Sequence, residues 1–193
     1  MKVCAIVDLS ARESNEYAYL RSPPEGFEVE SWRLAEGEPA GDDYPKNARI
    51  KMSPKEKGIE LPDVVGNNEG LLIVSARLKR AIEGLRLPLE ILPIAIYNHR
   101  GKVASNDHFI LNPLGTFDCL DTDEAEIEYL DDEVVSVDKF AFCPKKLKKV
   151  PHLFRVKEDP STIVLGDDVL KAWLTLVPEP TNFSIEHFEI PQG

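Results

Sequence analysis

Carboxylate side chains crowd one stretch of this 193-residue chain. The segment FDCLDTDEAEIEYLDDE, residues 117–133, contains nine aspartate and glutamate residues and neither lysine nor arginine. Carboxylates at this density can hold a divalent cation, act as acid and base in a catalytic centre, or present a negative surface to a cationic partner. The spacing of the residues helps to distinguish these three chemistries.

The second half of this acidic segment has the spacing of a β-strand. Glu124, Glu126 and Glu128 alternate with apolar residues, and a period of two predicts a strand with its carboxylates on one face. Side chains on one face of a strand lie roughly 7 Å apart and point in parallel. A single ion can hardly gather them, so this part of the segment does not have the form of a metal site.

A calcium loop of the EF-hand type does not fit the segment either. If the loop began at Asp121, its sixth position, where glycine is needed, would be Glu126. Asp118, Asp121 and Asp123 lie in a less regular part and could ligate a divalent cation. A metal-dependent or ligand-sensing module is therefore kept as an alternative, although acidic turns that face solvent are far commoner. We expect no cofactor.

Recognised catalytic motifs are absent from the sequence. It contains no GxSxG, GxxxxGK[ST], GxGxxG or HExxH pattern. The four histidines show no HxxxH spacing and none lies beside a cysteine: His99, His108, His152 and His187. An enzyme with unpatterned catalytic residues, for instance His108 beside Asp107 with a distant serine, is a second alternative. A deep pocket that holds a titratable pair with strongly perturbed pKa values would favour it.

The net charge of −11 comes from one part of the chain. Residues 103–138 contain eleven acidic residues and no lysine or arginine, whereas residues 1–102 (15 basic, 16 acidic) and 139–193 (8 basic, 7 acidic) are nearly neutral. Such a field repels nucleic acid and anionic membranes and attracts a cationic protein. A short basic run follows: Lys145, Lys146, Lys148 and Lys149. Because the nearby acidic residues offset its attraction for nucleic acid, we interpret this run as a turn in solvent.

The secondary structure predicted around these carboxylates indicates a single α+β domain over residues 1–193. We expect a mixed or largely antiparallel sheet and two short helices. KVCAIVDL (residues 2–9) and FEVESWRL (residues 27–34) predict the first two strands. Residues 36–70 are rich in glycine and proline and predict a loop, with room for a short strand near ARIKM, residues 48–52.

Two strand-helix-strand units are predicted 92 residues apart. LLIVSARLKRAIEGL (residues 71–85) and IVLGDDVLKAWLTLV (residues 163–177) each read as a strand, an N-cap at Ser75 or Asp167, and a helix. An alternating strand that ends at Pro93 or Pro191 follows each helix. The units are either a duplication or two similar pieces of ordinary structure. The predicted apolar stripes are Leu78, Ala81, Ile82 and Leu85 in the first helix, and Leu170, Trp173, Leu174 and Val177 in the second.

Cysteine and tryptophan residues fit a cytoplasmic protein with a buried core. Cys4, Cys119 and Cys143 are odd in number and lie in apolar segments, which predicts reduced core thiols. Trp32 and Trp173 have apolar neighbours and are expected to pack inside. No apolar stretch approaches the length of a membrane helix, and the N-terminal residues read as a strand rather than a secretory signal.

Residues 44–193 resemble a bacterial family known as immunity protein eleven, whose members accompany polymorphic and secretion-system toxins. Five sequence segments match the family, and their order supports the resemblance more than any single segment does. One departure is Gly166 and Asp167, where a Ser-Asp pair is expected. The matching segments are LPDVVGNNEGLLIVSARLKRAIEGL, LEILPIAIYNHRG, FILNPLGTFDCLD, PHLFRVKEDPSTIVLGDDVLKAW and FSIEHFEIP.

This resemblance implies a non-catalytic antidote that binds one specific toxin. It transfers no catalytic residue to this chain. The concentrated negative charge suits a basic toxin such as a nuclease or deaminase, so we predict that the acidic segment is the partner-binding surface. The predicted contact residues are Asp121, Asp123, Glu124, Glu126, Glu128, Asp131, Asp132 and Glu133.

Overall fold

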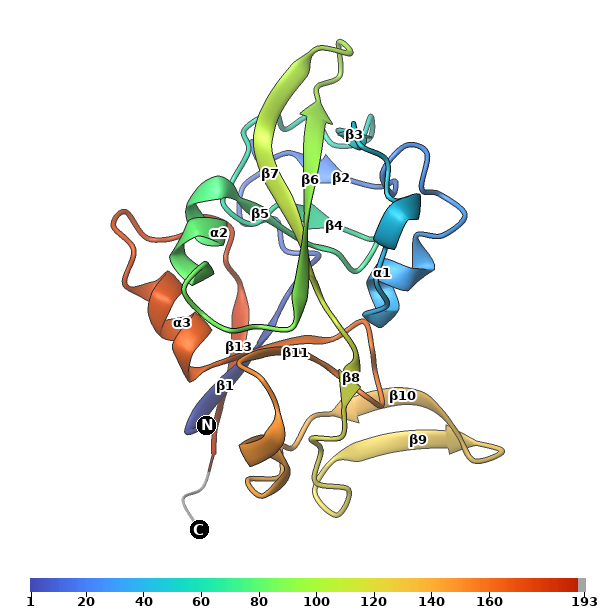
Figure 1. Ribbon diagram of the computed structural model, residues 1–193, viewed down its shortest axis with the longest axis vertical. Helices are drawn as coiled ribbons and strands as arrows, with labels where there is room; N and C mark the ends of the chain where they lie inside the picture. The colour runs from blue at the N-terminus through green and yellow to red at the C-terminus, as the bar shows by residue number, and fades with distance from the viewer. Residues whose placement is uncertain (191–193) are drawn as a thin grey trace.

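Two β-sheets that share a core with a pair of helices form the centre of the computed structural model, which describes residues 1–190 (Figure 1). One sheet has the order β3 (Arg49–Lys51), β6 (Leu89–Tyr97), β7 (Val103–Pro113), β5 (Leu72–Ser75). The other has the order β13 (Ile185–Glu189), β1 (Val3–Val7), β12 (Ile163–Gly166), β11 (Leu153–Val156), β8 (Thr116–Phe117).

Smaller elements complete the α+β architecture that the sequence predicted. Two short sheets pair β2 (Tyr19–Leu20) with β4 (Gly66–Asn67) and β9 (Glu126–Leu130) with β10 (Glu133–Lys139). The α-helices within residues 1–190 are α1 (Trp32–Glu36), α2 (Ala76–Ile82) and α3 (Asp167–Leu174). Two 3-10 turns are η1 (Gly41–Asp43) and η2 (Lys146–Lys149).

Three apolar clusters are stacked through the molecule because alternate side chains of each strand point to opposite faces. On β5, Leu72 and Val74 enter the central cluster together with helices α2 and α3, while Ile73 enters the cluster beyond the four-stranded sheet. On β12, Leu165 points to the central cluster and Val164 to a third cluster. Both sheets are thus covered on two faces.

The two predicted strand-helix-strand units have the same topology. In β5-α2-β6 the two strands are both antiparallel to β7, which lies between them. In β12-α3-β13 the two strands are both antiparallel to β1, which lies between them. The helices contact each other, and the indole Nε1 of Trp173 donates to the Leu78 carbonyl at 3.0 Å. The predicted end of the second unit at Pro191 lies outside the described residues.

The predicted strand over residues 27–34 is wrong. The Phe27 amide donates to the Pro24 carbonyl at 3.0 Å, and turns lead from there into α1. Phe27 and Leu34 are buried, but Val29 is 84% and Trp32 49% exposed, so burial does not follow a period of two. The prediction that Trp32 packs in the core is therefore also wrong, whereas that for Trp173 is confirmed.

Strand β6 does not end at Pro93 as predicted but continues to Tyr97. Proline lacks the amide proton of a strand ladder and is tolerated where one side of the strand has no strand partner. Strand β3 pairs with β6 only from Ala95 onward. Beside Pro93 the edge of β6 contacts a side chain instead of a strand: the Tyr44 hydroxyl donates to the Pro93 carbonyl at 3.1 Å.

The second helix differs from its prediction at both ends. Ser75 caps α2 as expected, but the N-cap position of α3 is Gly166, not Asp167. The Asp167 carboxylate instead accepts hydrogen bonds from the backbone amides of Lys2 and Val3, at 2.9 and 2.8 Å. Because α3 ends at Leu174, Leu174 and Val177 are exposed, and the buried residues of the helix are Val169, Leu170 and Trp173.

A buried arginine holds α1 against the five-stranded sheet. Arg155 on β11 is 1% exposed, and its guanidinium donates to the carbonyls of Leu34, Ala35 and Pro160 at 2.5, 3.0 and 2.8 Å. Burial lowers the pKa of Arg155 to about 10. Gly37, with φ +76°, ends α1, and a Cβ there would lie 2.8 Å from the Arg155 Cδ atom. Only glycine suits both its backbone conformation and this close approach.

Two further sequence predictions concern thiols and membranes. Cys4, Cys119 and Cys143 are free thiols, and burial raises the pKa of both Cys4 and Cys119 to about 12. Within residues 1–190, no helix is long and apolar enough to cross a membrane.

Candidate protein-binding surface

The carboxylates of the acidic segment lie on a hairpin that stands off from the two main sheets. Strands β9 and β10 form a two-stranded sheet, pair with no other strand of residues 1–190, and occupy the lower right of Figure 1. Ala125, Ile127, Val137 and Phe140 at its base pack against the third apolar cluster. We call residues 121–139 the acidic hairpin. Its attachment at one end leaves the far end in solvent.

Two acidic residues form the turn of the hairpin. Asp131 and Asp132 both have positive φ, 51° and 67°. A two-residue connection in which both residues are left-handed matches the twist of antiparallel strands, and aspartate tolerates this conformation better than most residues. These two predicted contact residues therefore also shape the tip.

Glu126 and Glu128 share one face of β9, as the sequence predicted, but the prediction is wrong for Glu124, which lies in the turn before the strand. Glu126 and Glu128 alternate with Ile127, and the pairing of Glu133 with Leu130 places Glu133 on the same face. Among residues 121–125, which precede β9, Asp123 and Glu124 are exposed and Asp121 is half-buried. The Asp121 carboxylate accepts a hydrogen bond from the Asp123 amide at 3.2 Å. The eight predicted residues are therefore gathered in one part of the fold.

None of these eight carboxylates has a cationic partner among residues 1–190. Even Lys139, opposite Glu126 on β10, forms no salt bridge with it. The neighbouring Asp118 differs, because Lys146 of the basic turn pairs with it at 2.7 Å and also donates to the Leu120 carbonyl at 2.8 Å. The basic run thus neutralises the start of the acidic segment but leaves the hairpin uncompensated.

Sequence reasoning missed an apolar patch at the end of the same hairpin. Tyr129, Leu130, Val134 and Val135 are 54, 66, 36 and 58% exposed. A period of two places Tyr129 on the same face as Ile127 but does not show where the supporting core ends. Leu130, which breaks the alternation at the end of a charged segment, was the available signal.

Metal binding finds no support in the side-chain arrangement. Within residues 1–190, no group of three or more His, Cys, Asp or Glu side chains is placed to hold a metal ion. Asp118, the first of the three residues considered for such a site, is engaged by Lys146.

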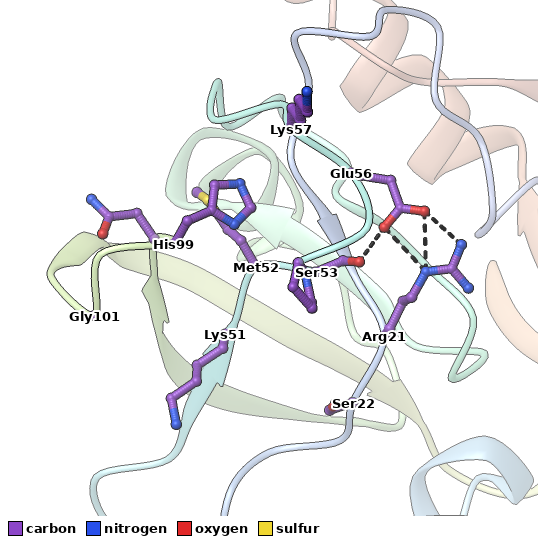
Figure 2. A pocket seen from close by; sticks show the side chains of 11 residues that line it. Arg21, Ser22, Lys51, Met52, Ser53, Glu56, Lys57, His99 and Gly101 are labelled. Carbon is purple, nitrogen blue, oxygen red and sulfur yellow. Dashed lines mark hydrogen bonds and ion pairs between the residues drawn. The ribbon is translucent and has the colours of Figure 1, made fainter.

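A cavity of about 620 Å³ lies at the other end of the molecule, beside the turn between β6 and β7 at the top of Figure 1. Figure 2 shows Glu56 in this cavity, held between Arg21 and Ser53. Their hydrogen bonds lower the pKa of Glu56 to about 2. A carboxylate of this pKa is a weak general base and stays ionised near neutral pH. The ion pair of Glu56 with Arg21 is therefore suited to stabilising the fold rather than to proton transfer.

His108, the histidine considered for catalysis, is also held in a structural setting. Its Nδ1 lies 2.9 Å from the Ser105 hydroxyl and its Nε2 lies 3.4 Å from the Pro62 carbonyl. Burial lowers the pKa of His108, and the ring is 6% exposed. Ser105 also accepts from the Asp107 amide at 2.9 Å. Both ring nitrogens thus face groups of the fold itself.

Comparison with known proteins bears on the class of this chain. The model of an immunity protein family, Imm11, matches residues 6–188. The match includes most of the N-terminal 43 residues, where the sequence segments gave only loose similarity. No curated protein matches the chain.

Proposed function

The chain belongs to the Imm11 immunity protein family, and from this premise we propose that it neutralises one specific, cationic toxin by binding it through the acidic hairpin. Proteins of this family inhibit toxins and are not enzymes. A cognate toxin is thus the partner class that the family implies. We place the encounter in the cytoplasm, where the three thiols of this chain would stay reduced.

The observation that carries the proposal is the contrast in charge pairing. Eight carboxylates lie close together on the acidic hairpin, and none of them forms a salt bridge among residues 1–190. Like charges at this density repel one another, and a partner that supplies lysine or arginine side chains removes that repulsion on binding. A cationic protein is therefore the partner that this surface is best built to attract.

The exposed carboxylates are expected to act mainly on the rate of association. Charges at the rim of an interface steer the encounter and make it sensitive to salt, whereas pairs that become buried and well matched also slow dissociation. Binding should therefore be fastest at low ionic strength, and the association rate should fall as salt is added.

The test uses as its probe the domain encoded by the reading frame next to the gene for this chain, once expression of that domain alone is shown to be toxic. Glu126, Glu128 and Glu133, which share one face of the hairpin, are changed together to lysine. Binding kinetics are measured at several salt concentrations, and growth is followed in cells that express the toxin. We expect the wild-type chain to protect the cells, and the triple variant to associate at least about tenfold more slowly with a flatter salt dependence.

A matched control changes the same net charge elsewhere. Glu13, Glu16 and Glu60 are exposed and form no salt bridge among residues 1–190. Changing these three to lysine should leave most of the association rate intact. If the wild-type chain gave no protection, the inhibitory role would be wrong. Equal effects of the two triple variants would instead show that the acidic hairpin is not the contact surface.

A further inference from the structure

Four exposed apolar residues lie close together at the tip of the acidic hairpin. Of the eleven large hydrophobic residues exposed in residues 1–190, four lie between positions 129 and 135. We call Tyr129, Leu130, Val134 and Val135 the apolar tip. Scattered single residues of this kind are normal on a protein surface, whereas a contiguous group marks an interaction site.

The hairpin register explains why this patch has no support within the chain. Ile127 lies opposite Val137, and both pack against the third apolar cluster. Tyr129 lies opposite Val134, on the same face but two residues farther out. A strand advances about 3.3 Å per residue, so Tyr129 and Val134 extend roughly 7 Å beyond the residues that touch the core. The apolar face of the hairpin therefore continues past the body of the protein.

An irregularity in β10 adds to the patch. The pairing shifts between Val134 and Ser136, which leaves Val135 as an extra residue in this strand. Such bulges turn side chains out of the regular alternation. Leu130, next to the turn, projects from the glutamate face, so the tip carries apolar side chains on both of its faces.

We propose that the apolar tip is the anchor of the interface, and that it enters an apolar recess bordered by lysine or arginine residues on the toxin. This inference rests on the proposed function and adds to it the part of the surface that holds the complex together. Tyrosine and neighbouring aliphatic residues at the centre of an interface supply most of its affinity once water is excluded, while surrounding charges select the partner.

Charge complementarity favours a cationic protein over a second copy of this chain. Asp131, Asp132 and Glu133 lie within or next to the apolar tip, and Glu128 is two residues from Leu130. Two hairpins meeting tip to tip would bring these carboxylates together without any cation to offset them. Like-charge contacts of this kind suppress self-association of exposed strands. The same field disfavours an anionic membrane surface.

Two variants of unchanged charge test the anchor: Tyr129→Ala, and Leu130→Ser combined with Val135→Ser. Binding to the same probe domain as in the test of the proposed function is measured by surface plasmon resonance. We expect each variant to weaken binding by about 30-fold or more, mainly through faster dissociation. The association rate and its salt dependence should stay close to wild type, because all carboxylates are retained.

Val29→Ser is the matched control, because Val29 is 84% exposed and lies outside the acidic hairpin. It should leave binding unchanged. Hydrogen exchange of the β9 and β10 amides shows whether the hairpin still forms in the Leu130 and Val135 double variant, which leaves the Tyr129 and Val134 pair intact.

The outcomes separate this inference from the proposed function. Wild-type binding that the folded tip variants retain would overturn the anchor while keeping the toxin-binding role. Loss of binding only in the lysine triple variant would do the same. A wild-type dimer in analytical ultracentrifugation that the tip variants abolish would show that a second copy covers the tip, which would also overturn the anchor. Absence of toxin binding by the wild-type chain would contradict the proposed function itself.

Discussion

Carboxylates occur in two contrasting settings in this protein, the body of the fold and the acidic hairpin. Asp63, in the body, accepts hydrogen bonds from the Ser75 hydroxyl at 2.6 Å, the Arg77 guanidinium and the Thr181 amide at 3.1 Å. Among the residues that the structure describes, Glu128 in the hairpin accepts only from the Ser136 hydroxyl, at 3.3 Å. The first carboxylate ties α2 to the loop before β13, whereas the second is left open to solvent.

The comparison teaches that the surroundings of a carboxylate decide what it can do. Burial alone would raise the pKa of Asp63, but hydrogen bonds from Arg77, Ser75 and Thr181 outweigh burial and lower it. Arg77 also donates to the carbonyls of Pro178 and Glu179, at 2.5 and 3.2 Å. A group saturated in this way stabilises the fold and has little left to offer a partner. Glu126, Glu128 and Glu133 of the hairpin strands form no salt bridge among residues 1–190, so we expect them to contribute little to the stability of the fold.

The largest expected effect is on stability, from Asp63→Ala. The change removes the acceptor for Ser75, Arg77 and Thr181, which are then left without their partner in a half-buried site. We expect the free energy of unfolding to fall by roughly 3 kcal/mol, measured by urea denaturation. Glu128→Ala should change it by less than about 0.5 kcal/mol. Similar losses in both variants would break the comparison.

An intermediate effect is expected from pH. Hydrogen bonds from Arg21 and Ser53 lower the pKa of Glu56 from 4.5 to about 2. A carboxyl group whose pKa is lowered on folding stabilises the folded state fully above its unfolded value, and that contribution is lost as the pH falls from about 4.5 toward 2. Glu56→Gln should therefore flatten the decline of the melting temperature across this acid range. A decline as steep as that of the wild type would contradict this role of Glu56.

The smallest effect is expected from removing hairpin charges. Changing Glu126 and Glu128 together to glutamine relieves repulsion within the hairpin, so the free energy of unfolding should stay equal or rise by up to about 0.5 kcal/mol. The gain should shrink as salt screens the charges. Denaturant unfolding at low and high salt measures it. A clear loss of stability would show that these glutamates support the fold after all.

Much of the scaffold could be predicted because local patterns and tertiary packing agree there. The apolar run of β1, the short strand β3, and the serine cap of α2 were all found from residue types and spacing. The alternation in β9 also predicted correctly that its glutamates share a face. In each case the residues that form the pattern lie close together in the chain, so local residue types and spacing are a sufficient guide.

The failures occur where distant residues decide the structure. Residues 27–34 form turns and a helix whose end is held by Arg155, more than a hundred positions along the chain. Asp167 resembles a helix cap, but its carboxylate binds the amides of Lys2 and Val3. The exposure of Tyr129 depends on where the third apolar cluster ends. None of these contacts changes the local pattern of apolar and polar residues from which secondary structure is predicted.

The attachment of the acidic hairpin at one end has a consequence for how such an inhibitor can change. Strands β9 and β10 form hydrogen-bonded sheet pairs only with each other, and the apolar side chains that hold them to the body lie at the base. Substitutions beyond Ile127 and Val137 therefore leave the core packing untouched. Under the proposed function, the residues that contact the toxin can therefore change without any change to the apolar clusters that hold the two main sheets together.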